Sequence, residues 1–384
     1  MKITDSVLYV GVNDREIDLF EGQYLVPKGM SYNSYAIIDE KIAIMDSVDA
    51  RFGEEWLSNI RRALGDRAPD YLIVQHMEPD HSANVTLFAQ AYPDALIVAS
   101  QKAFTMMKNF FGVDYAERRI IVGEGSSLSL GRRNLTFLTA PMVHWPEVIM
   151  TFDETEGLLF SADAFGKFGA LDADEPWLDE ARRYYIGIVG KYGAQVSALL
   201  AKAGKLPIRG ICPLHGPALF EDLPFYLSRY AAWAGYEPEE EGVLVAYTSI
   251  YGNTRRAAEA IAEALLARGV KVSLRDLARC DMAAAVADAF RFDRTVLATT
   301  TYNNALFPHM NEFIRHLTER GFKRRRIALI ENGSWAPAAA KLMREALMEC
   351  KELDFAETQI RILSAPTAET FLAISALADE LTER

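Results

Sequence analysis

The chain has 384 residues, of which 50% are hydrophobic and 24% charged, as in a globular protein of two or three domains. Its formal net charge of −12 argues against nucleic acid as a main partner, because an acidic surface repels phosphate groups. The longest apolar stretch near the N-terminus, residues 7–12, is soon interrupted by polar residues, so we expect no signal peptide, no membrane span and a cytoplasmic location.

The first part of the chain mixes short β-like runs with helical patterns. The predicted strands cover residues 34–38, 42–46, 71–75, 95–99 and 135–140, and a hairpin over 148–162 turns at 154–157. The predicted helices cover residues 54–64, 102–111 and 195–203. This mixture predicts an α/β sandwich with functional loops at one edge.

A regular alternation of strands and helices begins after an acidic segment, residues 236–242, that holds a proline and a glycine. We therefore predict two domains, residues 1–241 and 242–384. In the second, strands are predicted at 243–248, 270–276, 295–300, 326–331 and 358–363, and helices at 255–268, 282–289, 310–320, 336–349 and 368–382. These elements predict a doubly wound parallel sheet of flavodoxin size, with ligands at the carboxyl ends of its strands.

Seven potential metal ligands occur in the first domain, and four of them crowd into six residues directly after the apolar run at 71–74. They are His76, Glu78, Asp80, His81, His144, Asp163 and His215. A lone histidine is more often a core or surface residue than a ligand, but this joint placement favours a metal site. Four imidazoles and three carboxylates suit two adjacent metals if one carboxylate bridges them and each metal keeps an open position.

Three loops that follow strands of the second domain predict a pocket for a mononucleotide such as FMN. The first loop precedes a helix and offers hydroxyl, amide and backbone donors for a phosphate, without the lysine of a nucleotide P-loop. The other two loops add aromatic and amide side chains at neighbouring strand ends. The predicted pocket residues are Thr248, Ser249, Ile250, Tyr251, Gly252, Asn253, Thr254, Thr300, Thr301, Tyr302, Asn303, Asn304, Ala305, Asn332, Gly333, Ser334 and Trp335.

The segment that begins at His76 resembles the H-x-H-x-D-H signature of the metallo-β-lactamase superfamily, with Glu78 in place of the middle histidine. A carboxylate in place of an imidazole hardens the site and favours iron or manganese over zinc. With the flavin loops, the chain resembles the flavodiiron proteins over nearly its whole length. This resemblance implies a metallo-β-lactamase-like αββα sandwich followed by a flavodoxin-like domain with a parallel five-stranded sheet.

The same resemblance implies the cofactors and the metal ligands. His76, Glu78 and His144 would hold one iron, and Asp80, His81 and His215 the other, with Asp163 bridging the two. The interval of 52 residues between Asp163 and His215 is shorter than the resemblance leads us to expect. These ligands would also be the catalytic residues, and FMN would supply electrons to the two iron ions.

Proteins of this family reduce dioxygen to water, nitric oxide to nitrous oxide, or both, and we expect one or both reactions here. Because the chain has no C-x-x-C pair, electrons would come from an external donor, with rubredoxin expected and reduced deazaflavin as the second candidate. The resemblance also supports a head-to-tail homodimer, or a tetramer built from it. The basic residues 323–326 are either a docking patch for an acidic donor or a solvated loop before a strand.

Two functions from other classes remain open on the sequence. A zinc-dependent hydrolase of the metallo-β-lactamase type would activate a water molecule, but Glu78 and the flavin loops argue against it. An electron-transfer flavoprotein without gas reduction would require the loss of metal ligands, and all seven positions are filled.

Overall fold

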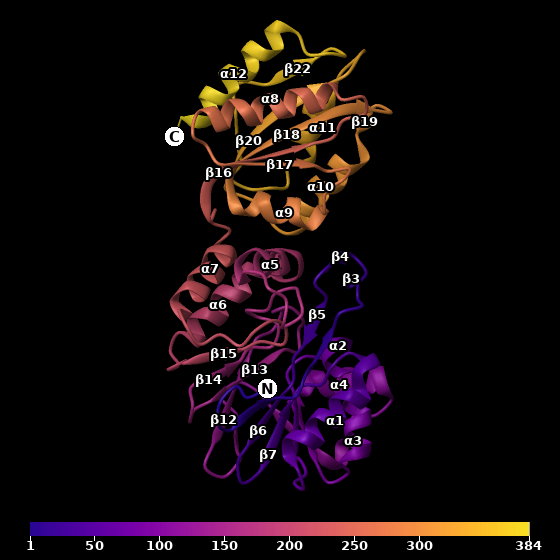
Figure 1. Ribbon diagram of the computed structural model, residues 1–384, viewed down its shortest axis with the longest axis vertical. Coiled ribbons are helices and arrows are strands. Elements are labelled where there is room, and N and C mark those ends of the chain that lie inside the picture. The colour runs from indigo at the N-terminus through magenta and orange to yellow at the C-terminus, as the bar shows by residue number, and fades with distance from the viewer. Residues whose placement is uncertain (384) are drawn as a thin grey trace. The chain divides into compact units, whose positions relative to one another are not determined.

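The computed structural model describes residues Met1 to Glu383, and these form two compact units (Figure 1). The first consists of Met1–Tyr185 and Ala194–Ala231, and the second of Ile186–Gly193 and Ala232–Arg384, of which all but the last residue is described. The two units thus divide near Ala231, while the first strand of the second unit begins at Glu240. The boundary between residues 241 and 242 stays a prediction.

The first unit contains two sheets with a shared core. The six-stranded sheet has the order β1 (Val7–Tyr9), β6 (Tyr35–Ile38), β7 (Ile42–Met45), β8 (Tyr71–Val74), β9 (Leu96–Ser100) and β10 (Arg119–Val122). The five-stranded sheet has the order β11 (Ser127–Ser129), β12 (Asn134–Thr139), β13 (Ile149–Asp153), β14 (Leu158–Phe160) and β15 (Gly210–Cys212). Alternate residues such as Tyr35 and Ile37 meet Phe137 and Phe160 in one buried cluster, so the predicted sandwich is confirmed.

Helices complete the layers of this unit. Figure 1 shows α1 (Gly53–Leu64), α3 (Val85–Ala91) and α4 (Gln101–Phe111) together beside the six-stranded sheet. The helix α1 buries Trp56, Ile60 and Leu64 along one stripe, and the indole of Trp56 donates a hydrogen bond of 2.9 Å to Ser34. The other helices are α2 (Pro79–Ser82), α5 (Trp177–Tyr184), α6 (Gly193–Ala203) and α7 (Leu223–Gly235), of which α6 begins and α7 ends in residues assigned to the second unit.

Several short elements lie outside the predicted set. Two small antiparallel pairs, β2 (Val12–Asp14) with β5 (Met30–Tyr32) and β3 (Leu19–Phe20) with β4 (Tyr24–Leu25), lie between β1 and β6 in sequence. Single turns of other helices occur at Ala50–Phe52, Ala116–Arg118, Tyr185–Val189 and Gly190–Tyr192. Strands of two or three residues contain too few residues to show an alternating pattern, which explains why the sequence did not predict them.

The second unit is a flavodoxin-like sheet with helices on its faces. Its strand order is β17 (Val272–Asp276), β16 (Glu240–Tyr247), β18 (Phe292–Tyr302), β20 (Arg326–Asn332) and β21 (Asp354–Phe355), all parallel. The predicted fifth strand, residues 358–363, corresponds to β22 (Ile360–Ile362), which pairs with the end of β20, while β21 lies before the predicted range and pairs with the start of β20. A further strand, β19 (Ala305–Leu306), pairs antiparallel with the end of β18.

Five helices accompany this sheet: α8 (Asn253–Ala267), α9 (Met282–Arg291), α10 (Pro308–Glu319), α11 (Ala339–Ala346) and α12 (Ala368–Thr382). Apolar residues of α8 and α12, among them Ile261 and Leu377, pack together on one face of the sheet. The predicted helix over 336–349 starts late, because Ala336 has a φ of 43° and precedes Pro337, which disfavours helical geometry at the residue before it. Within the described residues, no helix is long and apolar enough to cross a membrane.

The basic residues 323–326 form a partly exposed segment at the start of β20, and two of its arginines already have partners. Arg325 is 2% exposed and donates to the backbone carbonyls of Tyr236 and Phe290. Arg324 lies 2.5 Å from Glu237 and 3.0 Å from Glu352, so its charge is already compensated. These contacts favour the interpretation as a solvated loop before a strand, and donor docking at this cluster stays a prediction.

A buried ion pair at the start of β12 generates a prediction about stability. Arg133 lies 2.5 Å from Asp153, whose side chain is 0% exposed, and 2.7 Å from Glu156. We expect Arg133→Met to destabilise the first unit by about 3 to 5 kcal/mol, because it leaves a buried carboxylate without its counter-charge. Urea unfolding followed by circular dichroism measures the loss. The matched control is Lys2→Met, which breaks an exposed pair with Asp5 and should change almost nothing. Equal effects of the two substitutions would contradict the prediction.

Candidate functional site

Most of the predicted metal ligands lie in loops that follow strands. Glu78, Asp80 and His81 are on or beside the short helix α2, just after β8. The buried Asp46, which follows β7, shapes the start of this loop: its carboxylate accepts hydrogen bonds from the amides of Gln75 at 2.7 Å and His76 at 3.3 Å. The backbone carbonyl of His81 accepts two more hydrogen bonds from Ser47. The loop is thereby fixed by contacts with a neighbouring strand end.

The structure brings all seven residues together in two groups. One group consists of His76, Glu78, His144 and Asp163, and the other of Asp80, His81 and His215. Within each group the potential ligand atoms lie within 4.8 Å of one another. The short interval before His215 does not displace it, since its Nε2 is 3.1 Å from Nε2 of His81.

Asp163 stands between the two groups. Its Oδ2 is 3.2 Å from Nε2 of His76 and 3.1 Å from Nε2 of His144. Its Oδ1 is 3.2 Å from Nε2 of His81 and 3.8 Å from Nε2 of His215. Each carboxylate oxygen thus faces one pair of imidazoles, which is the arrangement that a bridging ligand requires.

The polar atoms of this cluster have few partners of their own. Both carboxylate oxygens of Asp80 and both of Asp163 are buried and make no hydrogen bond within the described residues. A buried carboxylate without a hydrogen bond or a cation is costly. Two pairs of imidazole nitrogens also face one another at 3.1 to 3.3 Å, which is close enough for each pair to share a metal ligand sphere. The donor set therefore fits metal cations.

The charges within the cluster shift its titration strongly. Burial alone would lower the pKa of His144, but contacts with Asp163 and Glu78 outweigh it and raise the pKa to about 9. Burial would raise the pKa of Glu78, but its contacts with His144 and His76 hold that pKa well below its ordinary value. Glu78 is thus anionic at neutral pH and can serve as a ligand.

Hydrogen bonds to Nδ1 orient two of the imidazoles. Nδ1 of His76 is 2.8 Å from Oε1 of Glu147, and Nδ1 of His215 is 2.7 Å from the backbone carbonyl of Ser31. Such contacts keep the proton on Nδ1, so the lone pair of Nε2 points into the cluster. Aromatic rings pack against the ligand imidazoles. The ring centre of Trp145 is 5.3 Å from that of His76, and the ring centre of Phe20 is 5.4 Å from that of His215.

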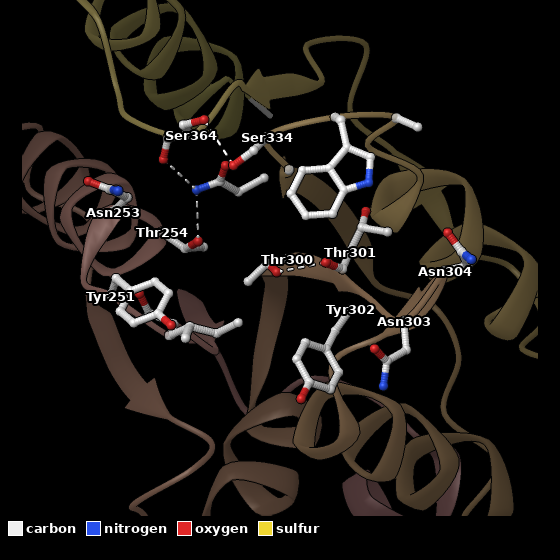
Figure 2. Close-up of a pocket in the computed structure, with 16 residues that line it drawn as sticks. Tyr251, Asn253, Thr254, Thr300, Thr301, Tyr302, Asn303, Asn304, Ser334 and Ser364 are labelled. Carbon is white, nitrogen blue, oxygen red and sulfur yellow. Dashed lines mark hydrogen bonds between the residues drawn. The ribbon is translucent and has the colours of Figure 1, made fainter.

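A separate cavity of about 660 Å³ opens at the carboxyl ends of the strands in the second unit. Figure 2 shows Tyr251 from the loop after β16, Tyr302 from the end of β18 and Ser334 from the loop after β20 around one space. The three predicted loops therefore converge. Its lining residues are Ser249, Ile250, Tyr251, Asn253, Thr254, Thr300, Thr301, Tyr302, Asn303, Asn304, Asn332, Gly333, Ser334, Trp335, Ala336 and Ser364.

Three predicted pocket residues do not line this cavity. The hydroxyl of Thr248 is buried against Thr299 at 2.6 Å, and Ala305 pairs with Tyr302 in a two-stranded ladder. Gly252 instead supports the first loop: its φ of 89° is left-handed, and its amide donates to Ser249 at 3.1 Å. All three residues thus support the loops without lining the cavity.

The cavity has neutral walls and exposed aromatic rings. None of its lining side chains carries a charge, whereas Tyr251 and Trp335 are 93% and 82% exposed. The amide nitrogen of Asn332 donates to the Thr254 hydroxyl and to the Ser364 carbonyl, both at 3.2 Å, and so links the loops. A flat aromatic ligand with an attached anion fits these features.

Known proteins share this architecture over the whole chain. Residues 30–216 match the ODP family beta lactamase and residues 244–358 match a flavodoxin domain. A nitric oxide reductase from Moorella thermoacetica is 30% identical over 91% of this chain and 90% of its own length. The chain belongs to the flavodiiron proteins.

Solved structures of the family agree with this membership. The rubredoxin oxygen:oxidoreductase of Desulfovibrio gigas superposes with a TM-score of 0.91 at 25% identity, covering 100% of this chain and 97% of the other. The flavodiiron protein of Giardia intestinalis gives a TM-score of 0.91 at 26% identity, covering 99% and 96%. All seven clustered residues of this flavodiiron chain lie inside the region that matches the ODP family.

Several residues near the sites of this flavodiiron protein were not predicted from the sequence, among them Ala336 and Ser364 of the cavity lining. Ser364 follows β22, and the rule that ligands bind at strand ends could have found it. Glu147 lies three residues after His144 and gave no signal of its own. Glu21, in the turn between β3 and β4, is close enough to Glu78 that desolvation and this charge raise its pKa to about 7.

Proposed function

We propose that this flavodiiron protein reduces dioxygen to water, nitric oxide to nitrous oxide, or both, with electrons that FMN delivers to two iron ions. The observation that carries the proposal is the convergence of seven ligand-type side chains in two groups around one carboxylate. Rapid mixing of the anaerobically reduced protein with each gas tests it. Oxidation by at least one gas, at a rate that depends on bound iron, is expected, and a reduced protein inert to both would overturn the proposal.

Each metal position has its own set of ligands in this proposal. His76, Glu78 and His144 would hold one iron, Asp80, His81 and His215 would hold the other, and Asp163 would serve both. When bound, the iron pair supplies two electrons and Lewis acidity to a small gas molecule. The exchange of an imidazole for Glu78 supports iron over zinc, because a carboxylate is the harder ligand.

The protein's own groups position the ligands and limit access of water. The Nδ1 contacts of His76 and His215 keep their Nε2 atoms directed into the cluster. Phe20, Trp145 and Tyr184 place rings within 5.3 to 5.5 Å of ligand imidazoles. An apolar surround strengthens electrostatic interactions inside the site and keeps bulk water out.

The second cavity would hold FMN through neutral donors. Hydroxyl and amide groups of Ser249, Asn253 and Thr254 lie where α8 begins and suit the phosphate, because helix N-terminal amides favour an anion. The exposed rings of Tyr251 and Trp335 are available to cover the flavin. FMN in this cavity would deliver the electrons for gas reduction.

A zinc-dependent hydrolase is the second candidate, and the shared metallo-β-lactamase-like fold favours it. It gives no role to the aromatic-lined cavity and no reason for Glu78 in place of a histidine. Metal analysis of the purified protein separates the two: two iron ions support the oxidoreductase, and zinc without iron supports the hydrolase. A flavoprotein that only transfers electrons would bind FMN and no iron pair.

The partners and location follow from the same proposal. An external carrier, rubredoxin or reduced deazaflavin, would reduce the FMN of a cytoplasmic enzyme. A head-to-tail homodimer, or a tetramer built from two such dimers, would bring the FMN of one chain to the irons of the other. Exposed apolar residues support this: Leu19 and Leu25 lie on the β3–β4 hairpin beside the metal cluster, and Tyr251 and Trp335 rim the FMN cavity.

Removal of a single imidazole should empty one metal position. His81→Ala is expected to leave about one iron per chain and to lower the rate of gas reduction by more than roughly 100-fold. Loss of a residue that only hydrogen-bonds to a metal ligand already lowers metal affinity or activity by about 10- to 100-fold. Metal analysis and rates of gas consumption measure both effects. The control His316→Ala removes a histidine of α10 in the second unit and should retain two irons. Full activity of His81→Ala would contradict the assignment.

Loss of the exposed indole should weaken FMN binding. Trp335→Ala is expected to raise the dissociation constant for FMN roughly 5- to 150-fold, because stacking of an aromatic ring on a base is worth about 1 to 3 kcal/mol. Quenching of flavin fluorescence measures it. Phe110→Ala removes another exposed ring, 48% exposed on α4, and should leave the affinity unchanged. If both variants bind FMN like the wild type, Trp335 does not contact the flavin.

Complementation tests the head-to-tail dimer. One variant, Ser249→Asp with Asn253→Asp, should lose FMN by repulsion of its phosphate, and the other, His81→Ala, should lose an iron. After subunit exchange, half of all dimers contain one chain of each variant. In a head-to-tail dimer, each of these heterodimers has one intact FMN–iron pair out of two, so about a quarter of wild-type activity should return. No recovery after subunit exchange, or an active monomer in analytical ultracentrifugation, would contradict this assembly.

A further inference from the structure

Glu147 is a wholly buried carboxylate in direct contact with a proposed iron ligand. Its side chain is 0% exposed, and Oε1 lies 2.8 Å from Nδ1 of His76 and 2.8 Å from the backbone amide of Met77. Its own backbone carbonyl accepts a hydrogen bond of 2.8 Å from the hydroxyl of Ser100. Contacts with two other segments therefore fix its position.

We infer that Glu147 is a positioning residue for the iron held by His76, Glu78, His144 and Asp163, and that its charge makes the two iron positions unequal. This inference rests on the proposed function, because it concerns the same pair of metal positions. Glu147 reaches the metal only through His76 and is not itself a ligand.

The histidines of the other position lack such a partner. Nδ1 of His215 contacts the neutral backbone carbonyl of Ser31 at 2.7 Å. Nδ1 of His81 is buried and has no hydrogen-bond partner within the described residues. A hydrogen bond between an imidazole Nδ1 and a carboxylate therefore occurs on one side of the pair only, at His76.

A second buried carboxylate nearby does not remove this difference. Asp46 accepts hydrogen bonds from the amides of Gln75 and His76 and from the side chain of Gln75. Among the described residues it accepts none from an imidazole ring. Asp46 therefore fixes the backbone of the loop, whereas Glu147 acts on the ring of His76.

The contact of Glu147 with His76 has two physical consequences for a bound metal. It fixes the ring with the Nε2 lone pair facing the cluster, which strengthens metal binding, and such outer partners are typically worth 10- to 100-fold in affinity. It also makes the imidazole a better electron donor and adds a negative charge in a buried, weakly screened place. Both effects favour the ferric form at this position, so this iron should be the harder of the two to reduce and to remove.

A merely structural role can be separated from this one by the choice of variant. In Glu147→Gln the amide oxygen can still accept from His76 and Met77, and the new NH₂ group replaces Oε2, which has no hydrogen-bond partner in the structure. This variant keeps the geometry and removes the charge. Glu147→Ala removes both.

The matched control removes the other buried charge. In Asp46→Asn one oxygen can still accept from the two amides, and the new NH₂ group can donate to Gln75, whose Oε1 is buried without a hydrogen-bond partner. No contact to an imidazole nitrogen changes. Asp46→Asn thus tests whether loss of any nearby buried carboxylate produces the same effect.

Iron release to a chelator and redox titration of the iron-loaded holoprotein test the inference. We expect Glu147→Ala to release one of its two irons at a roughly 10- to 100-fold lower chelator concentration than the wild type, with the second iron unchanged. Glu147→Gln should retain both irons while the midpoint potential of one of them rises. Asp46→Asn should shift this potential less than Glu147→Gln does.

Two results would overturn the inference. One is a Glu147→Gln protein whose iron potentials equal those of the wild type or shift no more than in Asp46→Asn, and the other is equal loosening of both irons in Glu147→Ala. If Glu147→Ala does not fold, Glu147→Gln decides alone. A wild-type protein that binds no pair of irons would instead overturn the proposed function, so the two failures are distinguishable.

Discussion

The first unit depends on the burial of one carboxylate, Asp163, among four imidazoles. It is 1% exposed, and neither of its oxygens makes a hydrogen bond within the described residues. Such a group is tolerated in a protein interior only when positive charge compensates it. The surrounding histidines supply this charge if they are protonated, and bound metal ions supply it otherwise. The packing of the two sheets matters because it brings Asp163, which follows a strand of one sheet, to the loops of the other.

The fold was largely predictable because its longer strands and helices carry clear patterns. Continuous apolar runs such as Tyr71–Val74 indicated buried strands, and the stripe of α1 indicated a helix on their surface. The hairpin β3–β4 was not predictable, since two-residue strands depend on tertiary contacts, here the packing of Phe20 against Phe168 and His215. The two-residue strand β21, which was not predicted, likewise depends on pairing with β20 rather than on local sequence.

The sites were predictable to the extent that residue type and spacing define them. Histidine and carboxylate ligands are few and chemically distinctive, so all seven proposed ligands could be named from the sequence. Their supporting contacts could not, because a glutamate such as Glu147 looks like any surface residue until its burial is known. The carbonyl of Ser31 is beyond any sequence argument, since every residue has a backbone carbonyl. Thr248 shows the converse error: it belongs to the right loop, but its side chain is buried in the sheet.

The two sites meet opposite electrostatic requirements. The metal cluster gathers several carboxylates in or near the protein interior, whose negative charge cations can balance, and it therefore favours metal cations. The second cavity has no charged lining and holds an anion only through dipoles and hydrogen bonds. A flavin gains electrons and protons during turnover, and neutral walls would let its charge change without breaking an ion pair. The iron pair changes charge too, but among fixed carboxylates, so the placement of a single extra charge such as that of Glu147 decides which of the two ions gives up its electron more readily.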